Sequence, residues 1–315
     1  MRHHIRRSKR AMFHPKAWRV RLLFWVGSLI VGLVAALFAL ASQEADHLFH
    51  YMLAKYSWLP LVLTPGGLVI IAWLTHRFFP GSQGSGIPQT IAAMEMNTKS
   101  AVLSIRIAIG KVFLTLLGLA CGASIGREGP TVHIGASLLY AFGRYSKYTP
   151  RYMEKGVILA GGAAGIAAAF NTPLAGIVFA IEELSRSFEQ RNSGIILMAV
   201  VIAGITSTVL LGHYHYFGTF DVSMPDAAAW FAVPVCGVLG GALGGLFSQG
   251  LISGSYKLKG FAGKHPYILA LICGLMVAVV GMSSQTSIYG TGYDAARNII
   301  DHGSKAEFDP FFPFA

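Results

Sequence analysis

The chain has 315 residues, of which 54% are hydrophobic and only 12% are charged. A soluble domain carries about 25% charged residues, so this composition argues against a water-soluble globule. It also excludes a disordered chain, because disorder requires low hydrophobicity. The uncharged residues fall in long runs spread evenly along the chain, which is typical of folding within a bilayer. We therefore expect one all-α membrane domain.

Positive charge is concentrated at the N-terminus. The formal net charge is +11, and eight Lys and Arg residues lie within positions 1–21. Such a cluster marks either a surface for nucleic acid or lipid headgroups, or a topology signal, because basic flanks of a first membrane helix stay in the cytoplasm. An apolar run starts at Leu22, which favours the topology signal. We expect residues 1–21 to be a basic cytoplasmic segment, and we expect no nucleic-acid partner.

Long uncharged runs predict membrane spans, since about 20 residues at a rise of 1.5 Å cross the hydrocarbon. The runs of sufficient length are 22–41, 57–76, 192–220, 227–256 and 265–293. After Phe79 the runs become shorter and are cut by Gly, Pro and single charges, and the 26-residue uncharged run 156–181 is split at residues 171–173. Irregular backbone at membrane depth survives only where protein or a water-filled cavity supports it. Interrupted segments of this kind point to the substrate site of a transporter.

Three short segments combine Gly or Asn with a proline and then continue as an apolar run: 84–88, 126–130 and 171–173. Proline is favoured in a first helical turn, and glycine lets backbone N–H groups come close to a ligand. Each segment therefore predicts a helix start, whose free N–H donors and partial positive charge bind anions. Ser85 adds a hydroxyl donor. The alternative for each segment is an ordinary helix cap at the membrane surface.

Glu128 lies inside the second of these segments, with apolar runs on both sides. A carboxylate within a membrane is costly and usually functional, and a helix N-terminus favours its negative charge. We expect Glu128 to occupy the anion site as a tethered competitor and to swing away when it is protonated. One side chain would then serve as a gate and as a proton carrier.

Other polar positions have two interpretations each. Glu182 and Glu183 form either a charge pair at a solvated helix end or a second proton station that faces the other side of the membrane. Lys111, at the head of an apolar segment, is either a snorkelling surface lysine or a buried source of positive potential that retains anions. His133 is interpreted as a packed polar residue rather than as a titrating neighbour of Glu128.

Small residues four positions apart predict close packing between helices. Gly161 and Gly165 form one such pair, and Gly237, Gly241 and Gly245 form a longer series. This pattern indicates packing and carries no chemistry.

At the three interrupted segments the sequence resembles the CLC chloride channel and transporter family, in particular its bacterial members. Residues 84–88 resemble the family's first selectivity motif, residues 126–130 its gating-glutamate motif, and residues 171–176 with Glu182 and Glu183 the segment of the internal glutamate. The resemblance extends from about Trp18 to the C-terminus. It implies a polytopic fold of two inverted repeats with broken, tilted helices. The implied division is a first repeat over 22–211, a linker over 212–226 and a partial second repeat over 227–315.

The resemblance also implies roles for individual residues. The segment around Ser85 would bind the central anion, Glu128 would be the external gate and proton acceptor, and Glu183 would be the internal proton-transfer glutamate with Glu182 beside it. Lys111 would supply electropositive support. The implied anion-binding residues are Gly84, Ser85, Gly86, Ile87, Pro88, Arg127, Glu128 and Gly129.

The implied function is exchange of chloride against protons. Family members that are pure channels typically have an apolar residue at the internal position, so Glu183 favours an antiporter, and serine at position 85 favours chloride. A passive chloride channel and a non-transporting fragment are the alternatives. An enzyme is not expected, because no nucleophile and base pair emerges from the sequence. No cofactor and no metal site are expected. The resemblance further implies a homodimer in a bacterial inner membrane.

The sequence departs from the family at two places. Gln89, Thr90 and Ile91 replace the acidic residues that often follow the first motif. The Gly-x-Phe-x-Pro motif, which supplies further amides to the anion, and the late tyrosine that caps it have no match. The second repeat is therefore expected to be incomplete, in a fragment or in a truncated reading frame.

Overall fold

The computed structural model describes residues 15–96, 98–145, 153–184, 193–212, 230–284, 288–293 and 295–297. Every regular element within these ranges is a helix, which confirms the all-α prediction. Residues 1–14, 213–229 and 298–315 lie outside the described ranges, and they include most of the expected basic segment (1–21) and most of the expected linker (212–226).

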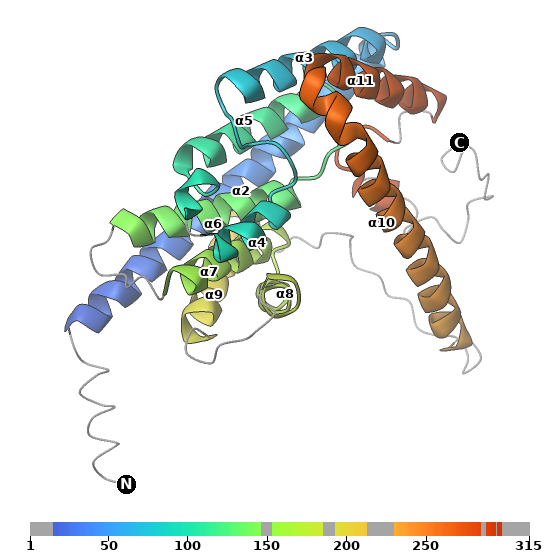
Figure 1. The fold of residues 1–315 in the computed structure, drawn as a ribbon. Coiled ribbons are helices and arrows are strands. Elements are labelled where there is room, and N and C mark those ends of the chain that lie inside the picture. The colour runs from blue at the N-terminus through green and yellow to red at the C-terminus, as the bar shows by residue number, and fades with distance from the viewer. Residues whose placement is uncertain are drawn as a thin grey trace.

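The helices follow one another in this order: α2 (Pro15–Lys55), α3 (Pro60–Arg77), α4 (Ile87–Glu95), the 3₁₀ turn η1 (Lys99–Ala101), α5 (Ile105–Ala120), α6 (Glu128–Tyr145), α7 (Glu154–Ala169), α8 (Pro173–Phe179), the π-helical turn η3 (Ala180–Leu184), α9 (Ser193–Leu211), α10 (Ala232–Lys264) and α11 (Pro266–Ser283). In Figure 1, α2 runs along the whole bundle, α6, α7 and α9 lie against it, α3 and α11 lie at one end, and α10 extends away.

Three helical stretches within the described residues are long and apolar enough to cross a membrane: Arg21–Lys55, Ala232–Lys264 and Pro266–Ser283. The first is longer than the predicted span 22–41, and the second continues past the predicted end at Tyr256. Both differences have one cause: a helix continues beyond its uncharged run where charged side chains reach solvent at its end. Within the predicted run 192–220, the structure describes α9 with an apolar part over Ile196–Leu211, and residues 213–220 lie outside the described ranges.

The three predicted helix starts are confirmed. The helix α4 begins at Ile87 with Gly86 as its cap, α6 begins at Glu128 with Pro130 in its first turn, and α8 begins at Pro173. Asn171, just before α8, has a positive φ of 54°. Proline fits the first turn because its missing N–H has no helical partner there.

The centre of the bundle is α7, whose residues are buried from Gly156 to Ala169. A helix that is apolar all round is a core helix, and glycine lets its neighbours approach. A Cβ atom on Gly165 would lie 2.6 Å from the Thr131 carbonyl oxygen, and a Cβ on Gly161 would meet the Gly135 carbonyl oxygen. The predicted close packing at Gly161 and Gly165 is therefore confirmed, with α6 as the partner.

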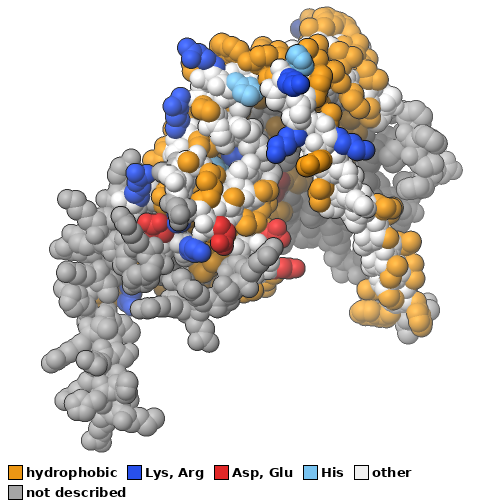
Figure 2. Space-filling view, viewed as in Figure 1, with side chains coloured by type: hydrophobic (Ala, Val, Ile, Leu, Met, Phe, Trp, Pro, Cys, Tyr) orange, Lys and Arg blue, Asp and Glu red, His pale blue; other side chains and the backbone are white. Residues whose placement is uncertain are grey.

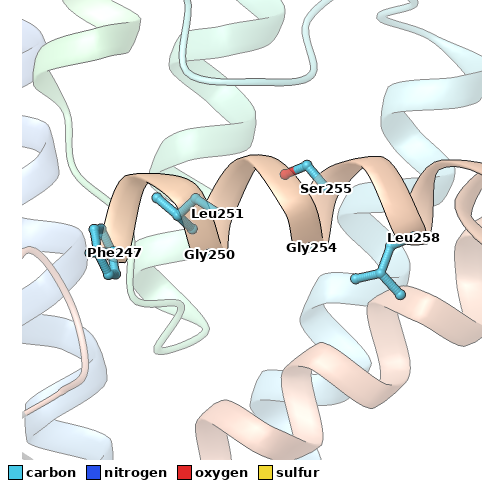
Figure 3. Close-up of a pocket in the computed structure, with 6 residues that line it drawn as sticks. All are labelled: Phe247, Gly250, Leu251, Gly254, Ser255 and Leu258. Carbon is cyan, nitrogen blue, oxygen red and sulfur yellow. The ribbon is translucent and has the colours of Figure 1, made fainter. Parts of the chain in front are cut away.

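The second predicted glycine series has no such partner among the described residues. No residue of α10 is buried. A Cβ atom on Gly237, Gly241 or Gly245 would meet nothing within 4 Å. A shallow groove runs along its later half, as Figure 3 shows. It is lined by Phe247, Gly250, Leu251, Gly254, Ser255 and Leu258.

The C-terminal helix α11 joins the first half of the chain at α3. The two helices run antiparallel, because Gly274 contacts Pro65 while Tyr267 lies beside His76, with 6.2 Å between the ring centroids. Beyond α11 the chain returns to α2, where the Tyr289 ring packs against the buried Phe49 ring at 5.0 Å. This return brings residues 288–293 next to the segment that precedes α6.

Candidate functional site

The first loop, residues 84–88, is shaped by two glycines with positive φ. Gly84 has φ 81° and Gly86 has φ 119°, a region that side-chain-bearing residues rarely adopt. The Gly86 N–H donates to Gln89 Oε1 at 2.9 Å, which closes the start of α4. Ser85 is exposed at the bend between the two glycines, whereas Gly86 is buried. The Ser85 side chain therefore faces outward, whereas the backbone of the loop is buried at Gly86.

Lys111 holds the same loop from α5. Its Nζ donates to the carbonyl oxygens of Gly84 at 2.7 Å and Ser82 at 3.1 Å, and the residue is only 2% exposed. Lys111 is therefore a buried lysine and not a snorkelling surface lysine, while its expected role in retaining anions stays a prediction. The helix α5 begins at Ile105, before the uncharged run that Lys111 precedes, so Lys111 lies within the helix.

Glu128 is the first residue of α6 and is half-buried. Its carboxylate bends back over the preceding loop, since a Cβ atom on Gly126 would lie 2.6 Å from Glu128 Oε2. The carboxylate therefore lies near the N-terminal end of its own helix. Negative charge is favoured at such a position by the helix dipole and by the free N–H groups of the first turn.

The two loops are in direct contact. A Cβ atom on Gly86 would lie 2.6 Å from the Gly129 carbonyl oxygen, and a Cβ on Gly129 would lie 2.8 Å from the Ser85 carbonyl oxygen. Only glycine at both positions allows this backbone approach. The segments that the sequence analysis assigned to anion binding, separated by about forty residues in the chain, thus form one site at the starts of α4 and α6.

The Arg127 side chain points away from this site. The residue is buried, its Nη1 donates to the Ala39 carbonyl oxygen of α2 at 2.8 Å, and its guanidinium lies 5.5 Å from the centre of the Tyr293 ring. The guanidinium thereby ties the second loop to α2. Any anion binding by Arg127 would therefore involve its backbone and not its side chain. The expected anion-binding role of Arg127 stays a prediction.

His133 packs one turn beyond Gly129 on the face of α6 that meets Gly86. It is fully buried, and its Nε2 lies 3.1 Å from the Val102 carbonyl oxygen. A Cβ atom on Gly86 would come within 2.8 Å of the His133 Cβ. These contacts agree with the interpretation of His133 as a packed polar residue behind the first loop.

Glu182 and Glu183 lie in η3, and both side chains are exposed. The end of η3 meets α4 and α6 at Gly162 of α7. A Cβ atom on Gly162 would lie 2.9 Å from the Leu184 side chain, 3.4 Å from the Val132 side chain and 3.8 Å from the Thr90 side chain. Gly162 is thus the point where η3, α6 and α4 converge. The third helix start lies elsewhere, with Pro173 packed on Gly204 of α9.

One contributor to the site region was missed by the sequence analysis. The Ile125 N–H donates to the Gly290 carbonyl oxygen at 3.2 Å, immediately before the second loop. Gly290 and Gly292 have φ of 76°, which the Gly-Thr-Gly sequence at 290–292 could have indicated as a tight turn. Its contact with the second loop crosses more than 160 residues of chain and leaves no local signal.

The described residues contain no group of three or more His, Cys, Asp or Glu side chains that could hold a metal ion. The donors that the two loops offer are backbone amides and the Ser85 hydroxyl. Such neutral donors hold an anion without the tight binding of a fixed cation.

A family model described as voltage gated chloride channel matches residues 66–314. The chain belongs to the CLC family. It is therefore a multi-pass membrane protein, in agreement with its apolar helices.

Relatives of the chain include proteins named as an exchanger and as a channel. The H(+)/Cl(-) exchange transporter ClcA of Vibrio cholerae is 30% identical over 234 residues, which cover 70% of this chain and 50% of that protein. The chloride channel protein CLC-d of Arabidopsis thaliana is 31% identical over 204 residues, covering 56% of this chain and 26% of that protein. The chain spans about half the length of the ClcA relatives that it matches.

Solved structures share the fold. A slow cyanobacterial Cl−/H+ antiporter is 26% identical with a TM-score of 0.70, and the match covers 84% of this chain and 64% of that one. A CLC-type fluoride/proton antiporter is 20% identical with a TM-score of 0.76, over 92% of this chain and 70% of that one. At that identity the second likeness concerns the fold alone.

Proposed function

We propose that this CLC chain belongs to a transporter that exchanges chloride against protons. The observation that carries the proposal is the single site built by the first loop, the second loop and the Glu128 carboxylate at the start of α6. Chloride would bind the amides of the two loops and the Ser85 hydroxyl. The names of the ClcA and cyanobacterial relatives, an exchange transporter and an antiporter, support the same reaction.

Glu128 is proposed as the gate. As a carboxylate it competes with chloride for the positive end of α6, because both are anions attracted by the same helix start. As a neutral acid it loses that attraction and leaves the position to chloride. Each proton that enters through Glu128 would therefore accompany the opening of the anion path.

Glu183, with Glu182 beside it, is proposed as the internal proton station. Protons would pass between η3 and Glu128 along the junction of η3, α6 and α4 at Gly162. Lys111 is proposed as a fixed positive charge beneath the first loop that retains anions near it. The basic N-terminal segment is proposed to lie on the cytoplasmic side of a bacterial inner membrane.

We propose a homodimer, with α8 and α9 at its interface. Both helices expose large apolar side chains, and two of them, Leu174 at 72% and Val209 at 78%, are among the more exposed residues of the first repeat. Apolar faces of this kind are covered by lipid or by a second copy. The family resemblance favours the second copy.

The decisive experiment is Glu128→Gln in proteoliposomes, with chloride efflux and proton uptake measured together. We expect chloride flux to persist and chloride-driven proton transport to fall by about 100-fold, the typical loss when a proton-transferring group is removed. Glu95→Gln, an exposed position at the end of α4, is the matched control and should leave both fluxes unchanged. Undiminished proton pumping by the Glu128 variant would refute the gate.

A second variant separates the antiporter from a passive channel. Glu183→Val should uncouple protons from chloride, and Glu182→Val shows which of the two adjacent carboxylates carries them. The reversal potential of the unmodified protein should shift with the pH gradient, because coupled exchange depends on both ions. A reversal potential that ignores pH would identify a channel, and the absence of any flux would identify a non-transporting chain.

A further inference from the structure

Three helix ends converge at the α3–α11 end of the molecule: the end of α3, the end of α10 and the start of α11. The antiparallel packing of α3 on α11 places His76 beside Tyr267. His265 links α10 directly to α11 and packs its ring 5.6 Å from Phe261. Since α10 and α11 are both long enough to cross a membrane, this junction lies at the end of two apolar spans.

Cations surround the junction. The Arg106 Nη2 and Nε donate to the Phe78 carbonyl oxygen at 2.8 and 3.1 Å, and the Arg77 guanidinium lies 6.0 Å from the Phe78 ring centre. On α10, Lys257 and Lys264 are seven residues apart and therefore share one face of the helix. These four residues, Arg77, Arg106, Lys257 and Lys264, form the basic collar. Figure 2 shows Lys, Arg and His side chains gathered over this end of the molecule.

The positive charge of the collar is not compensated. All four side chains are exposed. The ion pairs among the described residues lie elsewhere, between His50 and Asp46 in α2 and between Lys99 and Glu154. The collar therefore carries four cations without a described carboxylate partner, and it attracts anions from its surroundings.

Exposed aromatic rings accompany these cations. Trp73 is 48% exposed, Phe78 is 45% exposed and Tyr267 is 43% exposed, and the Trp73 and Phe78 rings pack edge to face at 5.6 Å. Amphipathic aromatic side chains at the ends of apolar helices lie at the level of the lipid headgroups. Cations at the same level meet phosphate groups, whose charge attracts each Lys or Arg.

We propose that the basic collar is a binding site for the headgroup of an anionic phospholipid. The phosphate would lie between the cations of α3 and α10, with the acyl chains along the exposed apolar surface of α10 and α11. The position at the ends of two spans favours a lipid over a soluble protein or a nucleic acid. None of the four cations belongs to the residues of the proposed anion path, so this proposal does not depend on the transport function.

The test is lipid retention by the complete chain in detergent, with phosphatidylglycerol and phosphatidylcholine offered in equal amounts and counted by native mass spectrometry. The unmodified chain should retain phosphatidylglycerol preferentially. The double variant R77Q/K264Q should lose that preference by about 25-fold, at roughly fivefold for each cation removed. The matched control R144Q/K155Q also removes one exposed arginine and one exposed lysine, and it should retain the preference.

A second measurement needs no variant. The preference of the unmodified chain for phosphatidylglycerol should fall steeply as salt is raised from 0.05 to about 1 M, because screening weakens exposed charge interactions. A preference that ignores salt, or one that the control pair weakens as much as the collar pair, overturns the proposal. Displacement of the lipid by millimolar inorganic phosphate also overturns it, since that result would identify a site for free phosphate.

Discussion

Lys111 and Arg127 show how single buried cations fix the two loops through hydrogen bonds to the backbone. Each is buried, and each donates to backbone carbonyl oxygens: Lys111 to the first loop and Arg127 to α2. A buried cation needs such acceptors, because leaving water without them is expensive. The two loops are thereby fixed in position by contacts to their backbone and to α2.

At this scale we predict that Lys111→Met destabilises the protein by about 2–3 kcal/mol, since two buried carbonyl oxygens lose their donors while the volume is nearly kept. The midpoint of thermal unfolding in detergent, followed by intrinsic fluorescence, measures the change. Lys155→Met replaces an exposed lysine and serves as the control, with an expected change of less than about 0.5 kcal/mol. An equal midpoint for the two variants would contradict the anchoring role of Lys111.

At the scale of elements, the same sequence pattern has two outcomes. The glycines of α7 lie against α6 at Gly135 and Thr131, whereas the glycines of α10 have no neighbour within 4 Å among the described residues. Glycines spaced by four predict that a helix can pack closely. Which helix it packs against depends on the path of the rest of the chain, which a local pattern does not contain.

This difference yields a second prediction. Gly161→Val should disrupt the crossing of α6 and α7, because its side chain would overlap the Gly135 backbone, and overpacking of a core typically costs about 1–3 kcal/mol. Gly244→Val is the control, because nothing lies within 4 Å of a Cβ atom there. Monodisperse protein recovered after heating, measured by size-exclusion chromatography, should fall for the first variant only. A loss shared by both variants would point to a general effect of valine.

At the scale of the whole molecule, the chain closes on itself through a small cluster. Phe49 of α2 is fully buried and packs on Tyr289, and Leu53, Leu63 and Val277 complete the cluster. These residues come from α2, α3, α11 and the segment after α11. The cluster therefore holds residues 288–293 against the second loop, where Gly290 accepts the Ile125 N–H.

We predict that Phe49→Ala destabilises the molecule by about 3–5 kcal/mol, since a large fully buried ring leaves a cavity. The loss should also loosen the second loop, which hydrogen exchange at Ile125 would report as faster exchange. Phe247→Ala, where the ring is 69% exposed, removes the same group from an open surface and should change neither quantity. An unchanged rate of hydrogen exchange at Ile125 in the Phe49 variant would show that the cluster does not stabilise the second loop.

Much of the fold was predictable because its signals are local. Proline after Gly or Asn identified the starts of α4, α6 and α8, and uncharged runs identified the spans. The ends of α2 and α10 were not predictable from charge alone, because Lys257 and Lys264 stay helical while their ammonium groups reach the surface. The contact of residues 288–293 with the second loop was not predicted, because contacts between residues far apart in the sequence produce no local pattern of residue types.

The sequence by itself determined a helical membrane protein of the CLC family and the starts of α4, α6 and α8, because composition, glycine and proline act on the nearest few residues. Only the tertiary structure decided that Gly86 and Gly129 touch, that Lys111 is buried under the first loop and that the Arg127 guanidinium points to α2. The physical reason is distance along the chain. The candidate site lies where the starts of α4 and α6 meet, and their contact depends on how α4, α6 and α7 pack together.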